Sequence, residues 1–186
     1  MLFVISAPSG AGKTTIIREL FKIFPNLKFS ISATTRKKRE RETDGKDYHF
    51  ISLDEFNSRK ESGEFVETEE VHGNYYGTLK KETEPYINSD SHLVFDVDVK
   101  GALTIKKLYP EAVSIFIDVP VEELIRRLKN RNTETEEDIQ KRASRIKLEV
   151  EMKSQFDHVI DNSKGLSSAV KAAEEIINKY NKKINT

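Results

Sequence analysis

The most regular feature of the sequence is a series of short, almost uninterrupted apolar runs, most of which are followed by stretches with helical spacing. The runs have the length of strands and cover residues 2–6, 29–32, 93–97, 113–119 and 159–161. Strands that are apolar at nearly every position are buried on both faces, as they are in parallel sheets covered by helices. The alternation of such strands with helices therefore predicts an α/β fold with a parallel β-sheet flanked by helices.

Four amphipathic stretches predict helices that pack on this sheet. The first has its apolar residues at positions 16–24, and the second, at residues 121–128, is opened by Pro120, which suits a first helical turn. The third and fourth have apolar side chains within residues 139–150 and 166–180. Because apolar residues recur every three or four positions in each stretch, one face of each helix is expected to contact the core.

Residues 33–91 break this alternation. They are polar, punctuated by glycine and rich in tyrosine, with short β-like pieces such as residues 48–51 and 64–67. We interpret them as a β-rich subdomain inserted into a core of residues 1–32 and 92–186, so that all 186 residues form one domain. Such an insert is expected to face a substrate.

A second polar stretch, residues 130–138, lies between two basic helical segments. Thr133 or Thr135 is expected to cap the helix that follows it. Long polar excursions in compact domains are often lids over a binding site. We therefore predict a lid at about residues 126–145.

The composition excludes several classes of protein. The 31 Lys and Arg residues balance the 31 Asp and Glu residues, so no global positive field attracts nucleic acid or an anionic membrane. Without cysteine there is neither a disulfide framework nor a thiolate metal site, and the 4 His residues are not spaced as metal ligands. No apolar run has the length of a membrane span or a signal peptide, so the protein is expected to be cytoplasmic. The sequence leaves the oligomeric state open.

The first apolar run leads directly into a glycine-rich turn, which carries the strongest functional signal in the chain. Residues 7–14 match the phosphate-binding pattern G-x-x-x-x-G-K-[ST], except that Ala7 replaces the first glycine. In such a loop, backbone N–H groups surround phosphate oxygens at the N-terminus of a helix, a lysine reaches the outer phosphates, and a hydroxyl binds Mg²⁺. We expect Thr14 to supply that hydroxyl. The expected nucleoside triphosphate contacts are Ala7, Pro8, Ser9, Gly10, Ala11, Gly12, Lys13, Thr14 and Thr15.

Two acidic residues, Asp96 and Asp98, lie at the end of the third apolar run. In an extended strand, residues two positions apart point to the same face, although a bend at the strand end would separate them. One of the two, with Asp96 as the candidate, is expected to support Mg²⁺ beside Thr14 through water, and the other to reach an acceptor substrate. The alternative is an acidic strand end that is only solvated.

A basic run that contains Arg36 and Arg39 follows a segment rich in hydroxyl groups. Arginine binds phosphate through two parallel hydrogen bonds, so these two residues are candidates for holding a monophosphate, with a solvated basic surface as the alternative. The segments at residues 45–50, 63–67 and 73–78 then add tyrosine, glutamate and threonine. Together they favour a site that recognises a base and its phosphate.

The motifs S-x-S-x-T-T-R-x-x-R, G-x-D-Y-x-F, E-F-x-E, G-N-Y-Y-G and D-x-D follow the phosphate loop in this order, and in them the chain closely resembles guanylate kinases over almost its whole length. The resemblance implies that the GMP phosphate is held by Arg36, Arg39, Tyr48 and Tyr76. It implies that guanine is recognised by Ser32, Glu67, Thr78 and Asp98. Guanine presents N1–H and its exocyclic amino group as adjacent donors, so one carboxylate such as that of Glu67 can accept from both, whereas adenine offers no such pair.

Residues 131–136, R-N-T-E-T-E, resemble the lid signature of the same family. The resemblance implies that the lid arginines are Arg131, Arg142 and Arg127. The implied catalytic residues are Lys13, Arg36, Arg131 and Arg142. Asn162 aligns with a residue near the adenine of ATP, for which a turn-forming asparagine is the alternative.

The resemblance implies reversible transfer of the γ-phosphoryl group of Mg-ATP to GMP, and also to dGMP, in purine nucleotide metabolism. One alternative is a kinase for another small phosphate acceptor, against which the guanine-recognising residues argue. The other is a non-catalytic module that uses the same cleft to bind phosphorylated peptides. Lys13, Thr14 and the lid arginines argue against that module.

Overall fold

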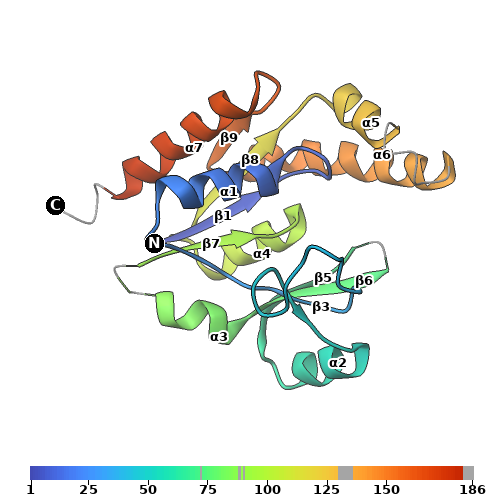
Figure 1. Ribbon diagram of the computed structural model, residues 1–186, viewed down its shortest axis with the longest axis vertical. Coiled ribbons are helices and arrows are strands. Elements are labelled where there is room, and N and C mark those ends of the chain that lie inside the picture. The colour runs from blue at the N-terminus through green and yellow to red at the C-terminus, as the bar shows by residue number, and fades with distance from the viewer. Residues whose placement is uncertain (72, 88, 90, 130–135, 182–186) are drawn as a thin grey trace.

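The computed structural model describes residues 1–71, 73–87, 89, 91–129 and 136–181 (Figure 1). The expected helix caps Thr133 and Thr135 lie outside the described residues. The elements occur along the chain in the order β1 (Leu2–Ser6), α1 (Lys13–Ile23), β2 (Leu27–Phe29), β3 (Ala33–Thr34), β4 (His49–Phe50), α2 (Leu53–Glu61), β5 (Phe65–Val71), β6 (Asn74–Leu79), α3 (Lys80–Thr83), η1 (Glu84–Tyr86), β7 (His92–Asp96), α4 (Val99–Leu108), β8 (Val113–Asp118), α5 (Val121–Lys129), α6 (Glu136–Glu151), η2 (Met152–Gln155), β9 (His158–Asp161) and α7 (Leu166–Asn181).

The main sheet of the described chain is parallel and has the strand order β2-β7-β1-β8-β9, so β1 is its central strand. Helices α1 and α7 cover one face of this sheet and α4 covers the other (Figure 1). Every residue of β1 is buried, because Phe3 and Ile5 face the first layer of helices while Leu2 and Val4 face the second. The predicted α/β fold with a parallel, helix-covered sheet is confirmed.

One predicted strand, residues 29–32, is wrong. Strand β2 ends at Phe29, and the Ser30 N–H still donates to the carbonyl oxygen of Val94 at 3.0 Å. The chain then leaves the main sheet and enters a second one at Ala33. Ser30 and Ser32 are buried during this crossing, which gives the segment the sequence pattern of a buried strand. The other four predicted strands are present, with ends that differ by at most one residue.

The second sheet has the strand order β4-β3-β6-β5 and lies within residues 33–91. It has an apolar cluster of its own, in which the ring of Phe56 stacks on that of Phe65 with centroids 4.6 Å apart. Figure 1 shows this sheet and α2 together beside the main sheet. The β-rich character of the insert agrees with the sequence, while its boundaries and those of the lid stay predictions.

A bulge in β5 sends three consecutive side chains in different directions. Phe65 and Glu67 each have a partner on β6, whereas Val66 between them is the extra residue. Phe65 packs in the cluster of the insert and Val66 packs against the main sheet. Gly77 permits this packing, because a Cβ atom there would lie 2.7 Å from the Phe65 ring. Glu67 is thereby left outside both apolar clusters.

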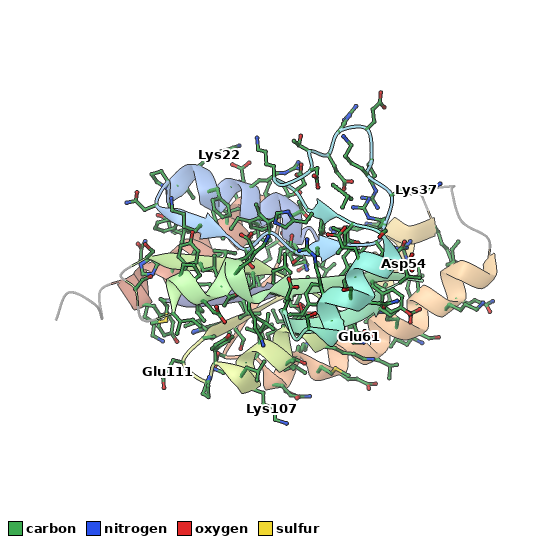
Figure 2. All side chains as sticks on the ribbon, turned by 90° about the horizontal axis from the view of Figure 1, so that it is seen from below. Lys22, Lys37, Asp54, Glu61, Lys107 and Glu111 are labelled. Carbon is green, nitrogen blue, oxygen red and sulfur yellow. The ribbon has the colours of Figure 1, made fainter. Side chains whose placement is uncertain are left out.

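Charged side chains cover the outside of the molecule. Figure 2 shows Lys22, Glu61 and Lys107 pointing away from the helices that carry them. Within the described chain, no helix combines the length and the apolar character needed to cross a membrane.

If the insert is a separate cooperative unit, Phe56→Ala should destabilise it alone. Phe56 is fully buried, and removing such a ring typically costs about 3–5 kcal/mol. We expect amide hydrogen exchange to accelerate in β5 and β6 and to stay unchanged in β1 and β8. As a matched control, Phe95→Ala in the main core should accelerate exchange in β1 and β7. Equal acceleration of all strands by Phe56→Ala would show that the insert does not unfold by itself.

Candidate active site

A cavity of about 510 Å³ opens where the carboxyl ends of β1 and β7 meet the second sheet and α6. Most of the residues predicted from the sequence line it, from both the donor and the acceptor groups. They are Ala7, Pro8, Ser9, Gly10, Ala11, Gly12, Lys13, Thr14, Thr15, Ser32, Arg39, Tyr48, Glu67, Tyr76, Asp96, Asp98 and Arg142. The predicted residues Arg36, Thr78, Arg127 and Asn162 do not line it directly, but each is bonded to a group that does.

The phosphate loop is shaped by two glycines and one asparagine. Gly10 and Gly12 have φ angles of 87° and 91°, in the left-handed region that favours glycine. A Cβ atom on Gly12 would also lie 2.7 Å from Nδ2 of Asn162. That amide nitrogen donates to the carbonyl oxygen of Ala11 at 2.8 Å. Asn162, which is buried, therefore holds the loop in place through its amide.

Helix α1 begins directly behind this loop, at Lys13, and no side chain caps its N-terminus. The first N–H groups of a helix lack partners within the helix and carry a partial positive charge. Here these groups lie at the wall of the cavity. The arrangement is a site for an anion such as a phosphate.

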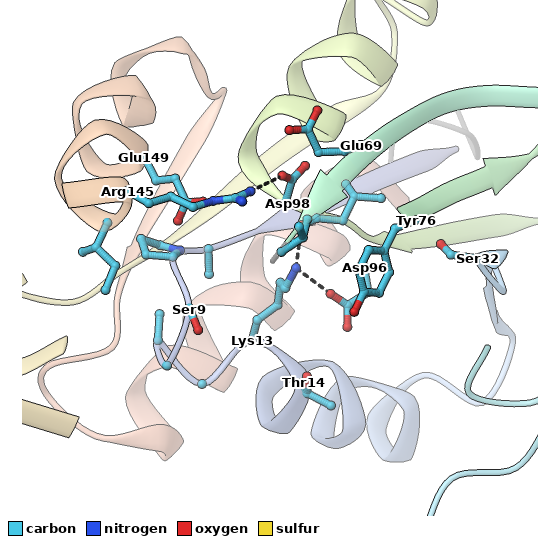
Figure 3. A pocket seen from close by; sticks show the side chains of 18 of the residues that line it. Ser9, Lys13, Thr14, Ser32, Glu69, Tyr76, Asp96, Asp98, Arg145 and Glu149 are labelled. Carbon is cyan, nitrogen blue, oxygen red and sulfur yellow. Dashed lines mark hydrogen bonds and ion pairs between the residues drawn. The ribbon is translucent and has the colours of Figure 1, made fainter. Parts of the chain in front are cut away.

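The side chain of Lys13 points from α1 to the end of β7 (Figure 3). Its Nζ lies 2.6 Å from Oδ1 of Asp96 and donates to the carbonyl oxygen of Val97. The same carbonyl accepts a hydrogen bond from Oγ of Ser6, which is fully buried. Lys13 is therefore held at the strand ends by contacts that a bound phosphate would compete with.

Two of the predicted lid arginines contact the phosphate loop. Arg142 donates from Nη2 to Oγ of Ser9 at 2.7 Å. Arg127 donates from Nη1 to the carbonyl oxygen of Gly10 at 3.0 Å and is also paired with Glu123. Arg131 lies outside the described residues.

Arg36 is fixed by several partners beside the cavity. Its Nε donates to the Tyr76 hydroxyl at 3.2 Å, and its guanidinium lies 5.4 Å from the ring centre of Tyr48. Its two terminal nitrogens bind both carboxylate oxygens of Glu42, at 2.8 and 3.0 Å. This paired hydrogen bonding raises the pKa of Arg36 and lowers that of Glu42. Arg39 is exposed and has its Nη1 4.0 Å from Glu42.

The carboxylate of Glu67 is anchored from across the sheet by Thr78. Oε1 accepts hydrogen bonds from the backbone N–H of Thr78 at 3.0 Å and from its hydroxyl at 2.7 Å. Among the described residues, these bonds leave Oε2 available. Burial raises the pKa of Glu67 to about 7 from its ordinary value of 4.5. The group is therefore a poorly solvated acceptor that gains from a ligand with hydrogen-bond donors.

Asp98 is separated from Asp96 because the chain bends after β7. Asp98 is the N-cap of α4, where its Oδ1 accepts from the N–H of Gly101 at 2.8 Å. Its Oδ2 accepts from Nη2 of Arg145 at 2.8 Å. Asp96 thus faces Lys13 at the donor loop, whereas Asp98 lies on the side of Glu67. A Cβ atom on Gly101 would be 3.0 Å from Oε2 of Glu67 and 3.1 Å from Oδ1 of Asp98.

Several residues of the site were not predicted from the sequence. Glu42 lies in a charged run whose alternative interpretation was a solvated surface. Arg145 and Glu149 of α6 were also missed; they follow the predicted Arg142 by three and seven residues, so all three share one face of the helix. That spacing was a usable signal. The other cavity residues that were missed are Glu69, Val71, Val97 and Ile146.

Comparisons with known proteins give one result. A family model described as "Guanylate kinase" matches residues 1–180. The guanylate kinase of Thermotoga maritima is 44% identical over 184 residues, 98% of this chain and 88% of that protein. The guanylate kinase of Chlorobium chlorochromatii is 47% identical over 178 residues, 95% of this chain and 93% of that protein. The crystal structure of guanylate kinase from Anaplasma phagocytophilum superposes with a TM-score of 0.80 at 27% identity, covering 97% of this chain and 86% of that one.

The shifted pKa of Glu67 predicts a pH-dependent stability. From pH 4.5 to about 7 the folded protein retains a proton that the unfolded chain releases, so the free energy of unfolding falls as the pH rises. A shift of this size corresponds to roughly 3 kcal/mol at most. Glu67→Gln lacks the titration and should be more stable than the wild type at about pH 8, with a smaller advantage at about pH 5. Urea unfolding of both proteins at the two pH values measures this. A difference that does not change with pH would contradict it.

Proposed function

The chain belongs to the guanylate kinase family and catalyses the ATP-dependent phosphorylation of GMP to GDP; from this premise we propose how the residues of the cavity share the reaction. The proposal rests mainly on one observation: a single cavity is lined both by the phosphate loop with Lys13 and by the anchored carboxylate of Glu67. The loop and the N-terminus of α1 suit the phosphates of a donor, and the carboxylate suits a base with hydrogen-bond donors.

The donor side binds the phosphates of ATP. The loop N–H groups and Lys13 contact the β- and γ-phosphates, and Lys13 moves from Asp96 to do so. Asn162 acts through the loop, since its amide holds the carbonyl oxygen of Ala11. It also borders the site proposed for adenine.

Mg²⁺ would be held by Thr14 and, through water, by Asp96. Both are oxygen donors of the type that Mg²⁺ prefers, and both line the cavity next to Lys13. In kinases the bound ion neutralises charge on the transferring phosphoryl group. The Asp96 carboxylate that Lys13 leaves on binding ATP then becomes available to the hydrated ion.

The acceptor phosphate is bound by Arg36 and Arg39 with the hydroxyls of Tyr48 and Tyr76. Support comes from Arg36, whose orientation is already set by Tyr76, Lys37 and the paired bond to Glu42; these bonds use all but one of its N–H groups, and the remaining one, on Nη2, is left for the phosphate. An arginine held in this way loses little side-chain entropy when it binds phosphate. Arg39 is exposed, and its guanidinium can exchange the 4.0 Å contact with Glu42 for the phosphate as the site closes.

Guanine is recognised by Glu67, with Ser32, Thr78 and Asp98 around it. Oε2 of Glu67 accepts from N1–H and the exocyclic amino group, while Thr78 holds Oε1. AMP would leave the carboxylate without donors in a poorly solvated position, which is costly. We also propose dGMP as a second acceptor, because the residues assigned to GMP contact its base and its phosphate.

Transfer needs positioning and charge neutralisation, and no covalent intermediate. Arg142 and Arg127 are already at the phosphate loop, and Arg131 is proposed to join them from the lid. Closure of the insert and lid over both substrates would exclude water and prevent hydrolysis of ATP. We also propose that the protein works in the cytoplasm without nucleic-acid or membrane partners, supported by its balanced charge and its bacterial relatives.

Acceptor specificity tests the role of Glu67. We expect kcat/KM for AMP to be at least about 10⁴-fold below that for GMP, because AMP lacks the donor pair. Glu67→Gln should lower kcat/KM for GMP by about 10²-fold, since it places an amide donor against the donors of guanine. ADP formation with GMP, AMP and UMP measures both effects, with the exposed Glu70→Gln on the same strand as control. Unchanged GMP turnover in Glu67→Gln would contradict the assignment.

The two aspartates should differ in their response to Mg²⁺. Asp96→Asn should raise the Mg²⁺ concentration for half-maximal activity several-fold while the KM for GMP stays the same, because the mutation weakens a ligand of the hydrated ion. Asp98→Asn should raise the KM for GMP and leave the Mg²⁺ concentration for half-maximal activity unchanged. Steady-state rates over a Mg²⁺ titration, at saturating and limiting GMP, distinguish them. Equal Mg²⁺ dependence in both variants would contradict the division of roles.

A further inference from the structure

We propose that Arg145 is a positioning residue for guanine recognition, which fixes the carboxylate of Asp98 and neutralises its charge beside Glu67. The family resemblance assigns functions to other arginines and leaves Arg145 without one. The inference rests on the function proposed above for Asp98 and Glu67. It adds a residue of α6 to the acceptor site, which the insert and β7 were expected to form.

Arg145 connects two acidic partners in fixed directions. Its Nη2 donates to Oδ2 of Asp98 at 2.8 Å, and its Nε donates to Oε1 of Glu149 at 2.7 Å (Figure 3). Glu149 lies one helical turn further along α6 and is almost completely buried. It therefore orients the guanidinium, whose Nη2 is directed at Asp98. The planar guanidinium can donate to both carboxylates at once, which the single ammonium group of a lysine does less well.

Asp98 needs such a partner because it lies in an acidic environment. Both its Oδ1 and the Oε2 of Glu67 approach the same point, the position of a Cβ atom on Gly101, to 3.1 and 3.0 Å. The two oxygens therefore lie within about 6 Å of each other, and carboxylates at such a separation repel each other unless a cation balances them. The charged groups that surround them come from five elements: Lys13 of α1, Glu69 of β5, Asp96 of β7, Lys100 of α4, and Arg145 and Glu149 of α6.

Within the described chain, Asp98 forms an ion pair with Arg145, whereas Lys13 pairs with Asp96. Lys100 is exposed and lies 3.6 Å from Glu69 instead. The contact is also shielded from solvent, since the side chains of Arg145 and Asp98 are 29% and 18% exposed. The Asp98 carboxylate thus receives one hydrogen bond on each oxygen, from Gly101 and from Arg145, and is held in one orientation.

Guanine recognition depends on that orientation. The exocyclic amino group has two hydrogens, and when one is bound by Glu67 the other points to a neighbouring acceptor, for which Asp98 is placed. Hypoxanthine, the base of IMP, keeps N1–H but has no amino group. The loss of Arg145 should therefore impair the use of GMP more than that of IMP.

The same contact affects the proton equilibrium of Glu67. The charge of Asp98 contributes to the raised pKa of Glu67, behind burial as the main cause. Without Arg145, the repulsion between the two carboxylates would grow, and Glu67 would hold its proton to higher pH. Since guanine needs the ionised carboxylate, the pH at which KM for GMP improves should also move upward.

The test compares Arg145→Met, Arg145→Lys, Asp98→Asn and the double variant Arg145→Met/Asp98→Asn in the full chain. Kinetics with GMP and IMP are measured from about pH 6 to 9. The exposed Lys147→Met on the same helix controls for the loss of one positive charge and should behave as the wild type. Urea unfolding establishes that each variant is folded under the assay conditions.

For Arg145→Met we expect kcat/KM to fall about 10- to 100-fold with GMP and clearly less with IMP, with KM for ATP unchanged and the pH midpoint for GMP raised. Arg145→Lys should restore part of the loss. In the double variant, Arg145→Met should no longer shift the pH midpoint for GMP, because Asp98→Asn has already removed the carboxylate charge that Arg145 neutralises.

Two contrary results have different meanings. If Arg145→Met lowers activity equally with GMP and IMP and leaves the midpoint in place, Arg145 only anchors α6, and the inference fails while the function stands. If Asp98→Asn itself does not change the GMP-to-IMP ratio, then the assignment of Asp98 fails, and the role of Arg145 with it.

Discussion

The site depends on one structural contact, the parallel pairing of β1 with β7. In this register Ile5 lies opposite Asp96, so both strands end at the same level of the sheet. The chain that leaves β1 becomes the phosphate loop, and the chain that leaves β7 carries Val97 and Asp98. The buried hydroxyl of Ser6 donates to the carbonyl oxygen of Val97 and ties these two exits together. Donor and acceptor groups therefore meet at the edge where parallel sheets commonly bind ligands.

The acceptor side is built at a cost in stability. A bulge directs Phe65 and Val66 into two different apolar clusters and leaves Glu67 in the cavity, where burial raises its pKa. The free protein tolerates this carboxylate because Thr78 provides two hydrogen bonds. A ligand with paired donors relieves the remaining cost, which is how a poorly solvated group produces selectivity.

The sequence was sufficient for the fold and for most of the cavity. Continuous apolar runs predicted four of the five expected strands, and the phosphate loop and the acceptor motifs identified the residues that the fold brings together. Residues 29–32 were assigned wrongly because a buried crossing between two sheets has the same pattern as a strand. The bend after β7 was foreseen only as an alternative.

Partners that lie far apart in the chain could not be predicted. Arg145 contacts Asp98 across 47 positions, and nothing in the local pattern of α6 indicates which element its polar face meets. Glu42 lies in a charged run, and its role could not be predicted, because only the path of the loop brings it into a bidentate pair with Arg36. Periodicity shows which face of an element is polar, but the partner of that face is set by tertiary packing.

If one edge of the sheet holds ATP and GMP end to end, the protein should bind a dinucleotide in which adenosine and guanosine are joined through five phosphates. By calorimetry we expect one site per chain, tighter binding than for ATP or GMP alone, and weaker binding after either Lys13→Ala or Glu67→Gln. Binding no tighter than that of ATP, and unaffected by Glu67→Gln, would contradict this arrangement.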